Sequence, residues 1–179
     1  MTARHAWALV ALLPALAGCV TVEATLRADG SATLEMTYRT TPDATEFLER
    51  RRYSSRFVHV DAVKIHESQR TVLRATVDDV TKLATAPGFA LVDVRRRRDG
   101  DDERLEIRLL NEHPAAVPED RAVEPWMQIG LTLPGPVRDA NHDARVEGTH
   151  VAWTVTRSDY ARHGATLLTV RWRSAGAAS

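Results

Sequence analysis

Two stretches of alternating side chains, residues 20–26 and 32–38, constrain the fold of this chain most strongly. In each stretch apolar residues occupy every second position and mostly polar residues fill the positions between. Successive side chains of a β-strand point to opposite faces, so each stretch predicts a strand with one buried and one wet face. The intervening Ala28-Asp29-Gly30 is typical of a tight turn. We therefore expect residues 20–38 to form a β-hairpin.

The same alternation predicts further strands along the chain. They are expected at about residues 57–65, 71–77, 89–97, 103–110, 127–133, 151–155 and 168–172. Residues 89–97 and 103–110 should form a second hairpin around Asp99-Gly100. Its expected inward residues are Ala90, Val92 and Val94, facing Leu105, Ile107 and Leu109. After the strand at 127–133, proline fixes φ and glycine accepts a positive φ, so Pro134-Gly135 should end the strand and reverse the chain.

Two short helices are expected between the strands. Thr41 offers an N-cap with Pro42 as the first helical residue, for a helix that runs to about Tyr53. The residues that fall on one side of it are Ala44, Phe47, Leu48 and Arg51. The second helix should begin at Asp78-Asp79 and end at Pro87-Gly88, with Val80, Leu83 and Ala84 facing inward.

These elements predict an α+β fold. We expect an antiparallel β-sheet of about seven to nine strands, in hairpins and a meander, with two short helices packed on one face.

The N-terminus has the layout of a bacterial lipoprotein signal. Arg4 precedes a short apolar run that ends in Leu16-Ala17-Gly18, followed by Cys19, the only cysteine of the chain. The run is too short to span a bilayer, so residues 1–18 are interpreted as a signal peptide that is removed. Cys19 should then carry a diacylglyceryl thioether and an amide-linked chain such as palmitate. The alternative is a buried free cysteine.

A lipidated Cys19 implies a protein of the cell envelope, because two or three acyl chains attach a protein to a membrane permanently. Val20 does not act as the inner-membrane retention signal that aspartate gives, so outer-membrane sorting is expected in a cell with two membranes. Residues 19–173 are predicted to be a single domain, and residues 174–179 a short disordered tail.

Charge narrows the range of partners. The chain has 24 basic and 24 acidic side chains, and removing residues 1–18 takes away one base and no acid. This neutral balance argues against nucleic acid as a partner and against simple electrostatic adhesion to anionic lipid.

Several of these stretches resemble the LppM-like family of bacterial lipoproteins. The resemblance lies in Cys19 with the hairpin 20–38, in Leu133-Pro134-Gly135-Pro136-Val137, in Asn141, and in residues 146–148 and 151–155. It implies an envelope lipoprotein with an α+β domain across residues 19–173. The function it implies is binding of envelope glycolipids and host interaction rather than catalysis.

The sequence offers little for catalysis or metal binding. No histidine pair has the spacing and acidic support of a metal site, and no Gly-x-Ser-x-Gly or phosphate-binding glycine loop occurs. We therefore expect no cofactor, no metal and no enzymatic activity. His142 beside Asp143 could bind a cation, although a solvated loop is the better interpretation.

Three residues are candidate ligand contacts. Arg95 and Arg97 could form a basic fork for lipid phosphates, the alternative being charge pairs with the acidic residues 99–103 across the hairpin. Trp126 precedes a strand and could line the mouth of a pocket, the alternative being a core position. Trp153 and Trp172 are expected in the core.

Two functions from different classes remain. The first is a non-enzymatic lipoprotein that binds lipid or glycolipid in a concave apolar gap between sheet and helices. The second is a structural or assembly module that docks on another envelope protein through exposed strand edges or the arginine-rich helix end.

Overall fold

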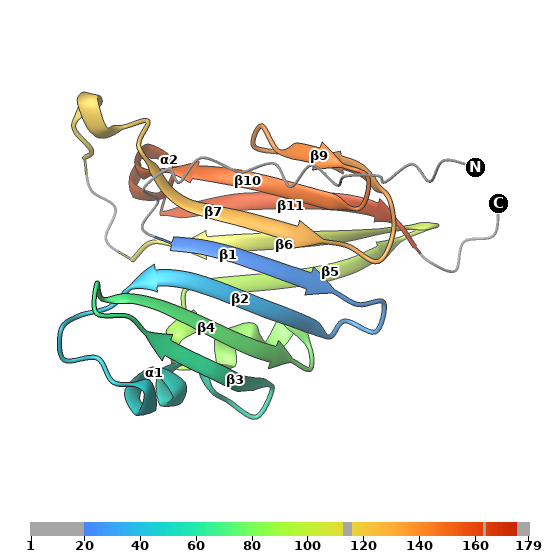
Figure 1. Ribbon diagram of the computed structural model, residues 1–179. Coiled ribbons are helices and arrows are strands. Elements are labelled where there is room, and N and C mark those ends of the chain that lie inside the picture. Colours follow the sequence, from blue (N-terminus) through green and yellow to red (C-terminus); the bar gives the residue numbers. More distant parts are fainter. Residues whose placement is uncertain (1–19, 113–115, 163, 175–179) are drawn as a thin grey trace, which may run out of the picture.

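The computed structural model describes residues 20–112, 116–162 and 164–174. Within them, eleven strands form two sheets that face each other across a shared core (Figure 1). The larger sheet has the order β3 (Val58–Ile65), β4 (Arg70–Val77), β2 (Ala32–Arg39), β1 (Val20–Leu26), β7 (Pro125–Thr132), β10 (His150–Thr156) and β9 (Arg145–Glu147). The smaller has the order β5 (Val92–Asp99), β6 (Asp102–Leu110), β11 (Ala165–Arg173) and β8 (Val137–Ala140). The prediction of a β-rich α+β fold is confirmed.

The first hairpin forms as the sequence predicts. Strands β1 and β2 pair antiparallel, with Val20 opposite Tyr38. In the turn, Gly30 has φ 93° and the Asp29 carboxylate accepts hydrogen bonds from the Ser31 N–H at 2.9 Å and hydroxyl at 2.7 Å. An aspartate that bonds to the backbone two residues on, followed by a glycine with positive φ, stabilises such a turn.

The prediction of one antiparallel sheet is wrong in two respects. There are two sheets, and β1 pairs parallel with β7, with Val20 opposite Met127. Alternation marks the face of a strand that avoids water but does not say what covers that face. Here the inner face of a second sheet supplies most of the cover, as in β-sandwiches. After β6 of the smaller sheet, the chain enters the larger sheet at the end where β1 begins. Strands β7 and β1 therefore run in the same direction and pair parallel.

The first helix, α1 (Glu46–Tyr53), begins later than predicted. The Thr41 carbonyl accepts the Ala44 N–H at 3.1 Å and closes a turn, and it is the Thr45 hydroxyl that caps the helix by accepting the Leu48 N–H at 3.2 Å. The side predicted from the sequence is the solvent side: Phe47 and Leu48 are exposed, whereas the buried residues of the helix are Glu49 and Tyr53.

The second predicted helix is a pair of 3₁₀ turns, η1 (Val80–Thr85) and η2 (Pro87–Phe89). Proline disfavours the helical conformation in the residue before it, and Ala86 is accordingly extended with ψ 129°. In a 3₁₀ turn residues three apart share a face, so Val80, Leu83 and Ala86 point inward and Ala84 is exposed.

The second hairpin is confirmed as β5 and β6, although β5 begins only at Val92. Ala90, predicted to face inward, is exposed because it caps η2.

The helices do not cover one sheet face as predicted: α1 packs on β3 and η2, and η1 packs on β5. Strands β8 and β9, the turn η3 (Glu119–Arg121) and the helix α2 (Arg157–Arg162) had no counterpart in the prediction.

The turn after β7 works differently from the prediction. Gly135 does not have a positive φ; it is needed because a Cβ there would lie 2.1 Å from the Arg173 carbonyl oxygen. Instead of reversing within its sheet, the chain crosses from the larger sheet to β8 of the smaller one. The Arg173 N–H donates to the Pro136 carbonyl at 3.0 Å and joins the crossing to β11.

The core carries the two tryptophans that the sequence places there. Trp153 on β10 and Trp172 on β11 are both at most 2% exposed. The Trp153 indole N–H donates to the Asn141 carbonyl at 2.9 Å, and Asn141 also bonds to the backbone of β11. Asn141 thereby ties the two sheets together at this end of the core.

Candidate functional site

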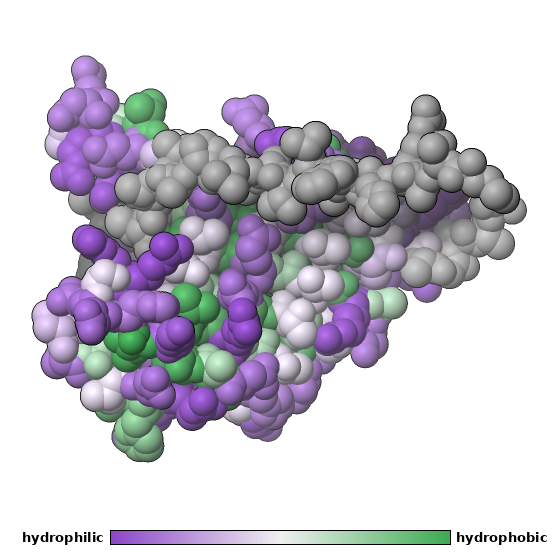
Figure 2. All heavy atoms as spheres, in the orientation of Figure 1, coloured by the Kyte–Doolittle hydropathy of each residue, from purple (hydrophilic) through white to green (hydrophobic). Residues whose placement is uncertain are grey.

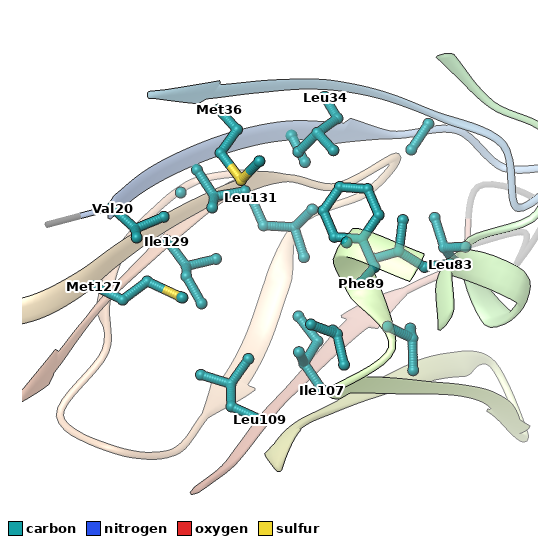
Figure 3. Close-up of a pocket in the computed structure, with 18 of the residues that line it drawn as sticks. Val20, Leu34, Met36, Leu83, Phe89, Ile107, Leu109, Met127, Ile129 and Leu131 are labelled. Carbon is teal, nitrogen blue, oxygen red and sulfur yellow. The ribbon is translucent and has the colours of Figure 1, made fainter. Parts of the chain in front are cut away.

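An apolar cavity of about 400 Å³ lies between the two sheets. Its walls come from β1, β2 and β7 on one side and from β5 and β6 on the other, with η1 and η2 between them. Figure 3 shows Met36 and Ile129 on one wall and Ile107 and Leu109 on the other, with Phe89 beside the gap. The volume falls within the range of about 300–1,000 Å³ that is typical of small-molecule sites.

The lining is almost entirely aliphatic and aromatic. Apolar residues that line the cavity include Val20, Val22, Ala24, Leu34, Met36, Phe89, Ile107, Leu109, Met127, Ile129 and Leu131. Arg39 and Arg52 are the only charged residues among those described that line it, and both are exposed. Exposed residues can line a cavity only where it meets solvent. The cavity therefore opens beside Arg39 and Arg52, at an end called the mouth below.

Two tyrosines and a glutamate support the wall beside the mouth. The buried Tyr38 hydroxyl donates to the Glu49 carboxylate, and its ring lies 5.6 Å from that of Tyr53, edge to face. Burial raises the pKa of Tyr38, and the hydrogen bond to Glu49 raises it further. Burial likewise raises the pKa of Tyr53, so both phenols are neutral. This bond fixes α1 to the end of β2.

Close packing of Gly88 holds the Tyr53 ring in place. A Cβ at Gly88 would lie 2.3 Å from a carbon of that ring, so only glycine fits there. The Tyr53 ring in turn lies 5.0 Å from Phe89, which lines the cavity. The position of the cavity wall thus depends on contacts between α1 and η2.

At the end of the molecule away from the mouth, Arg96 on β5 links the two sheets. Its guanidinium donates to the Ala28 carbonyl in the first hairpin turn at 2.7 Å and forms an ion pair with Glu103. Both side chains of the pair are largely buried, 18% and 14% exposed. The guanidinium also lies 5.9 Å from the Trp172 ring centroid. Arg96 therefore joins the two sheets at this end of the molecule.

Trp126, a candidate from the sequence, lies in the cavity wall. Its ring stacks on Tyr160 of α2, with centroids 3.8 Å apart and planes 16° apart. The Tyr160 hydroxyl donates to the Leu110 carbonyl at 3.1 Å, which fixes the stack against the end of β6. Trp126 also lines a smaller pocket of about 210 Å³ on its other side, so it separates the two spaces.

The other two candidates, Arg95 and Arg97, lie outside the cavity. Arg95 pairs with Asp93 at 3.1 Å, and Arg97 is exposed on the same strand. Sequence reasoning missed the arginines at the mouth. Arg52 belongs to the arginine-rich end of the predicted first helix, and Arg39 simply follows an alternating strand. The only sign in the sequence that these two arginines could lie together was their position, at the ends of the predicted strand 32–38 and of the helix that follows it.

Two of the described histidines lie against carboxylates. His142 lies 3.3 Å from the Asp159 carboxylate, and His59 lies 2.8 Å from that of Asp78. Burial works to raise the pKa of Asp159, but hydrogen bonds from Thr156 and the neighbouring His142 outweigh it, so the pKa is lowered. In the part of the chain that the structure describes, no group of three or more His, Cys, Asp or Glu is placed to hold a metal ion.

Leu16, Ala17, Gly18 and Cys19 lie outside the described residues. None of the helices described is long and apolar enough to cross a membrane. Comparisons of the chain with protein-family models, with curated proteins and with solved structures found no match. The resemblance to the LppM-like family therefore stays a prediction.

Proposed function

We propose that this protein is a membrane-anchored envelope lipoprotein that binds acyl chains of a lipid or glycolipid and catalyses no reaction. The observation that carries the proposal is the apolar cavity of about 400 Å³ between the sheets. Its wall offers a long apolar surface with charged groups only at the mouth. Such a site suits a ligand with an extended hydrocarbon part and a polar end that stays near water.

The size of the apolar contribution is sufficient for useful affinity. Each buried methylene contributes about 0.8 kcal/mol, so a chain of about ten contributes about 8 kcal/mol. A net binding free energy of about −8 kcal/mol corresponds to a Kd of about 1 μM. Loss of translational and rotational freedom costs about 4 kcal/mol or more. A Kd of about 1 μM therefore requires about fifteen buried methylenes rather than ten.

The proposed acyl anchor at Cys19 suits the same function. Val20 lines the cavity, and Cys19 directly precedes it in the sequence. Acyl chains on Cys19 would therefore hold this wall of the cavity close to the membrane surface. In a host with two membranes, we expect that membrane to be the outer one.

The test is binding of a fluorescent long-chain fatty acid to the delipidated protein. Ala24→Phe places a ring inside the cavity, because Ala24 lines it, and should weaken binding at least about tenfold. Thr25→Phe is the matched control, since Thr25 is the next residue of β1, is exposed and does not line the cavity. Equal binding by both variants would refute the proposal. Protein purified from its own membranes should also carry lipid that mass spectrometry detects.

A second candidate function is docking on another envelope protein. Strands β3 and β9 end the larger sheet, and β5 and β8 end the smaller one, so the described sheets have four strand edges without a partner strand. Such edges can pair with a strand of another chain. Crosslinking in intact cells that yields one dominant protein, together with no fatty-acid binding, would favour this function.

A further inference from the structure

Helix α1 presents its largest apolar side chains to solvent. Phe47 is 70% and Leu48 49% exposed, whereas Glu49 and Tyr53 are buried. At about 100° per residue, Arg51 and Arg52 share the outward half of the helix with Phe47 and Leu48. The outward face of α1, defined by these four residues, thus places each apolar side chain four positions from an arginine.

The arginines of this face are available to an external anion. Within the described residues neither Arg51 nor Arg52 forms an ion pair, and Arg52 makes only a ring contact with Tyr53, at 5.4 Å. Arg50, by contrast, donates to the Val60 carbonyl and anchors the helix to β3. Although the whole chain is close to neutral, the outward face of α1 carries two cations and no acid.

This face lies at the same end of the molecule as the mouth and the start of β1. Tyr38 is paired with Val20 across the first hairpin and bonds to Glu49 of α1. Arg52 belongs both to the outward face of α1 and to the mouth. Figure 1 shows α1 near the end of the larger sheet where β1 begins. Figure 2 shows a green protrusion at the lower left, over α1, among purple surroundings.

We propose that the outward face of α1 docks on an anionic lipid surface and seats the mouth against it. Exposed Phe and Leu side chains can insert at a membrane interface, and arginines close to an anionic surface are attracted to its lipid phosphates. Phe47 and Leu48 would insert among the acyl chains, while Arg51 and Arg52 pair with lipid phosphates. A lipid could then move between bilayer and cavity without its chain crossing open water. The contact is additional to the acyl anchor proposed at Cys19.

The experiment is vesicle flotation of residues 19–179 carrying Cys19→Ser, so that neither the apolar signal segment nor an acyl anchor contributes. Vesicles are phosphatidylcholine alone or mixed with phosphatidylglycerol. The chain should float with the anionic vesicles and much less with the neutral ones. Phe47→Ser with Leu48→Ser should reduce partitioning at least about tenfold. Arg51→Gln with Arg52→Gln should reduce it about 25-fold, at about fivefold for each arginine near an anionic surface.

Val146→Ser is the matched control, because Val146 is 43% exposed on β9, at the opposite edge of the larger sheet from β3. It should leave flotation unchanged. The proposal is overturned if the parent does not float, if it floats equally with neutral vesicles, or if Phe47→Ser with Leu48→Ser floats like the parent. A protein partner for α1 would show as the first of these outcomes.

The proposal of membrane docking by α1 and the proposal of lipid binding in the cavity can be refuted independently. Phe47 and Leu48 do not line the cavity, so Phe47→Ser with Leu48→Ser should bind the fluorescent fatty acid in vesicle-free solution as the parent does. Flotation without fatty-acid binding would refute the cavity proposal and leave the docking face standing. Fatty-acid binding without flotation would refute the docking face and leave the cavity proposal standing.

Discussion

Replacing Arg96 by alanine should loosen the contact between the two sheets at the end away from the mouth. The Arg96 guanidinium is the link there: it donates to the Ala28 carbonyl of the larger sheet's hairpin turn and pairs with Glu103 of the smaller sheet. Arg96→Ala removes both contacts at once. It leaves the Glu103 carboxylate, 14% exposed, with only a hydroxyl of Ser174 at 3.3 Å.

The expected loss of stability is about 3 kcal/mol. Removing one partner of a fully buried ion pair costs about 3–5 kcal/mol because the other charge is left without compensation. Partial exposure lets water reach Glu103, which lowers that contribution to about 2 kcal/mol. Loss of the hydrogen bond to the Ala28 carbonyl adds about 1 kcal/mol.

Urea unfolding followed by tryptophan fluorescence measures this difference directly. Arg97→Ala is the control, because Arg97 is the next residue of β5 and is exposed; its effect should stay within about 0.5 kcal/mol. If Arg96→Ala and Arg97→Ala unfold at the same urea concentration, the link between the sheets does not contribute as the geometry requires.

Three other substitutions test separate parts of the fold. Gly135→Ala should destabilise by about 2 kcal/mol or more in urea unfolding, because its Cβ meets the Arg173 carbonyl oxygen and backbone cannot swing aside. Trp153→Phe should lose about 2 kcal/mol in the same assay, from a smaller ring and an unpaired Asn141 carbonyl; no change would show that this bond is not made. Asp159 has a lowered pKa in the folded state, so its stabilisation is present above its unfolded pKa and is lost as the pH falls through the folded one. Asp159→Asn should therefore lose less stability than the parent as the pH falls from about 5 towards about 2, and parallel losses would contradict the assignment.

The parts of the fold that the sequence predicts are those set by neighbours in the chain. The hairpin of β1 and β2 needs only alternation and a turn with Asp29 and Gly30, and both are local. The parallel pairing of Val20 with Met127 joins residues more than a hundred positions apart. Neither strand carries a local mark of its partner, so the second sheet and the parallel pair were missed.

The candidate site was predictable only in part for a related reason. Trp126 could be singled out because it precedes a predicted strand beside Pro125, and it does lie in the cavity wall. Arg39 and Arg52 reach the mouth through the packing of α1 against the end of β2, which Tyr38 and Glu49 create. A buried glutamate inside a helix rich in charges gives no sign in the sequence that it faces inward.

The cavity itself is invisible to periodicity, because its wall has the same alternation as a solid core. The free energy cost of an unfilled space distinguishes a cavity from a solid core. At about 24 cal/mol per Å³, an empty apolar space of about 400 Å³ costs as much as about 10 kcal/mol, an upper limit because the mouth admits solvent. That is of the order of the whole stability of a domain, about 5–15 kcal/mol. Ala24 and Ala32 on the wall leave room that larger aliphatic residues would fill.

Ala24→Phe should accordingly stabilise the delipidated protein by about 1 kcal/mol while it blocks the fatty acid, the combination expected of a wall shaped for a ligand. If Ala24→Phe destabilises the delipidated protein, the cavity has no room for the added ring, and the reasoning from its volume fails.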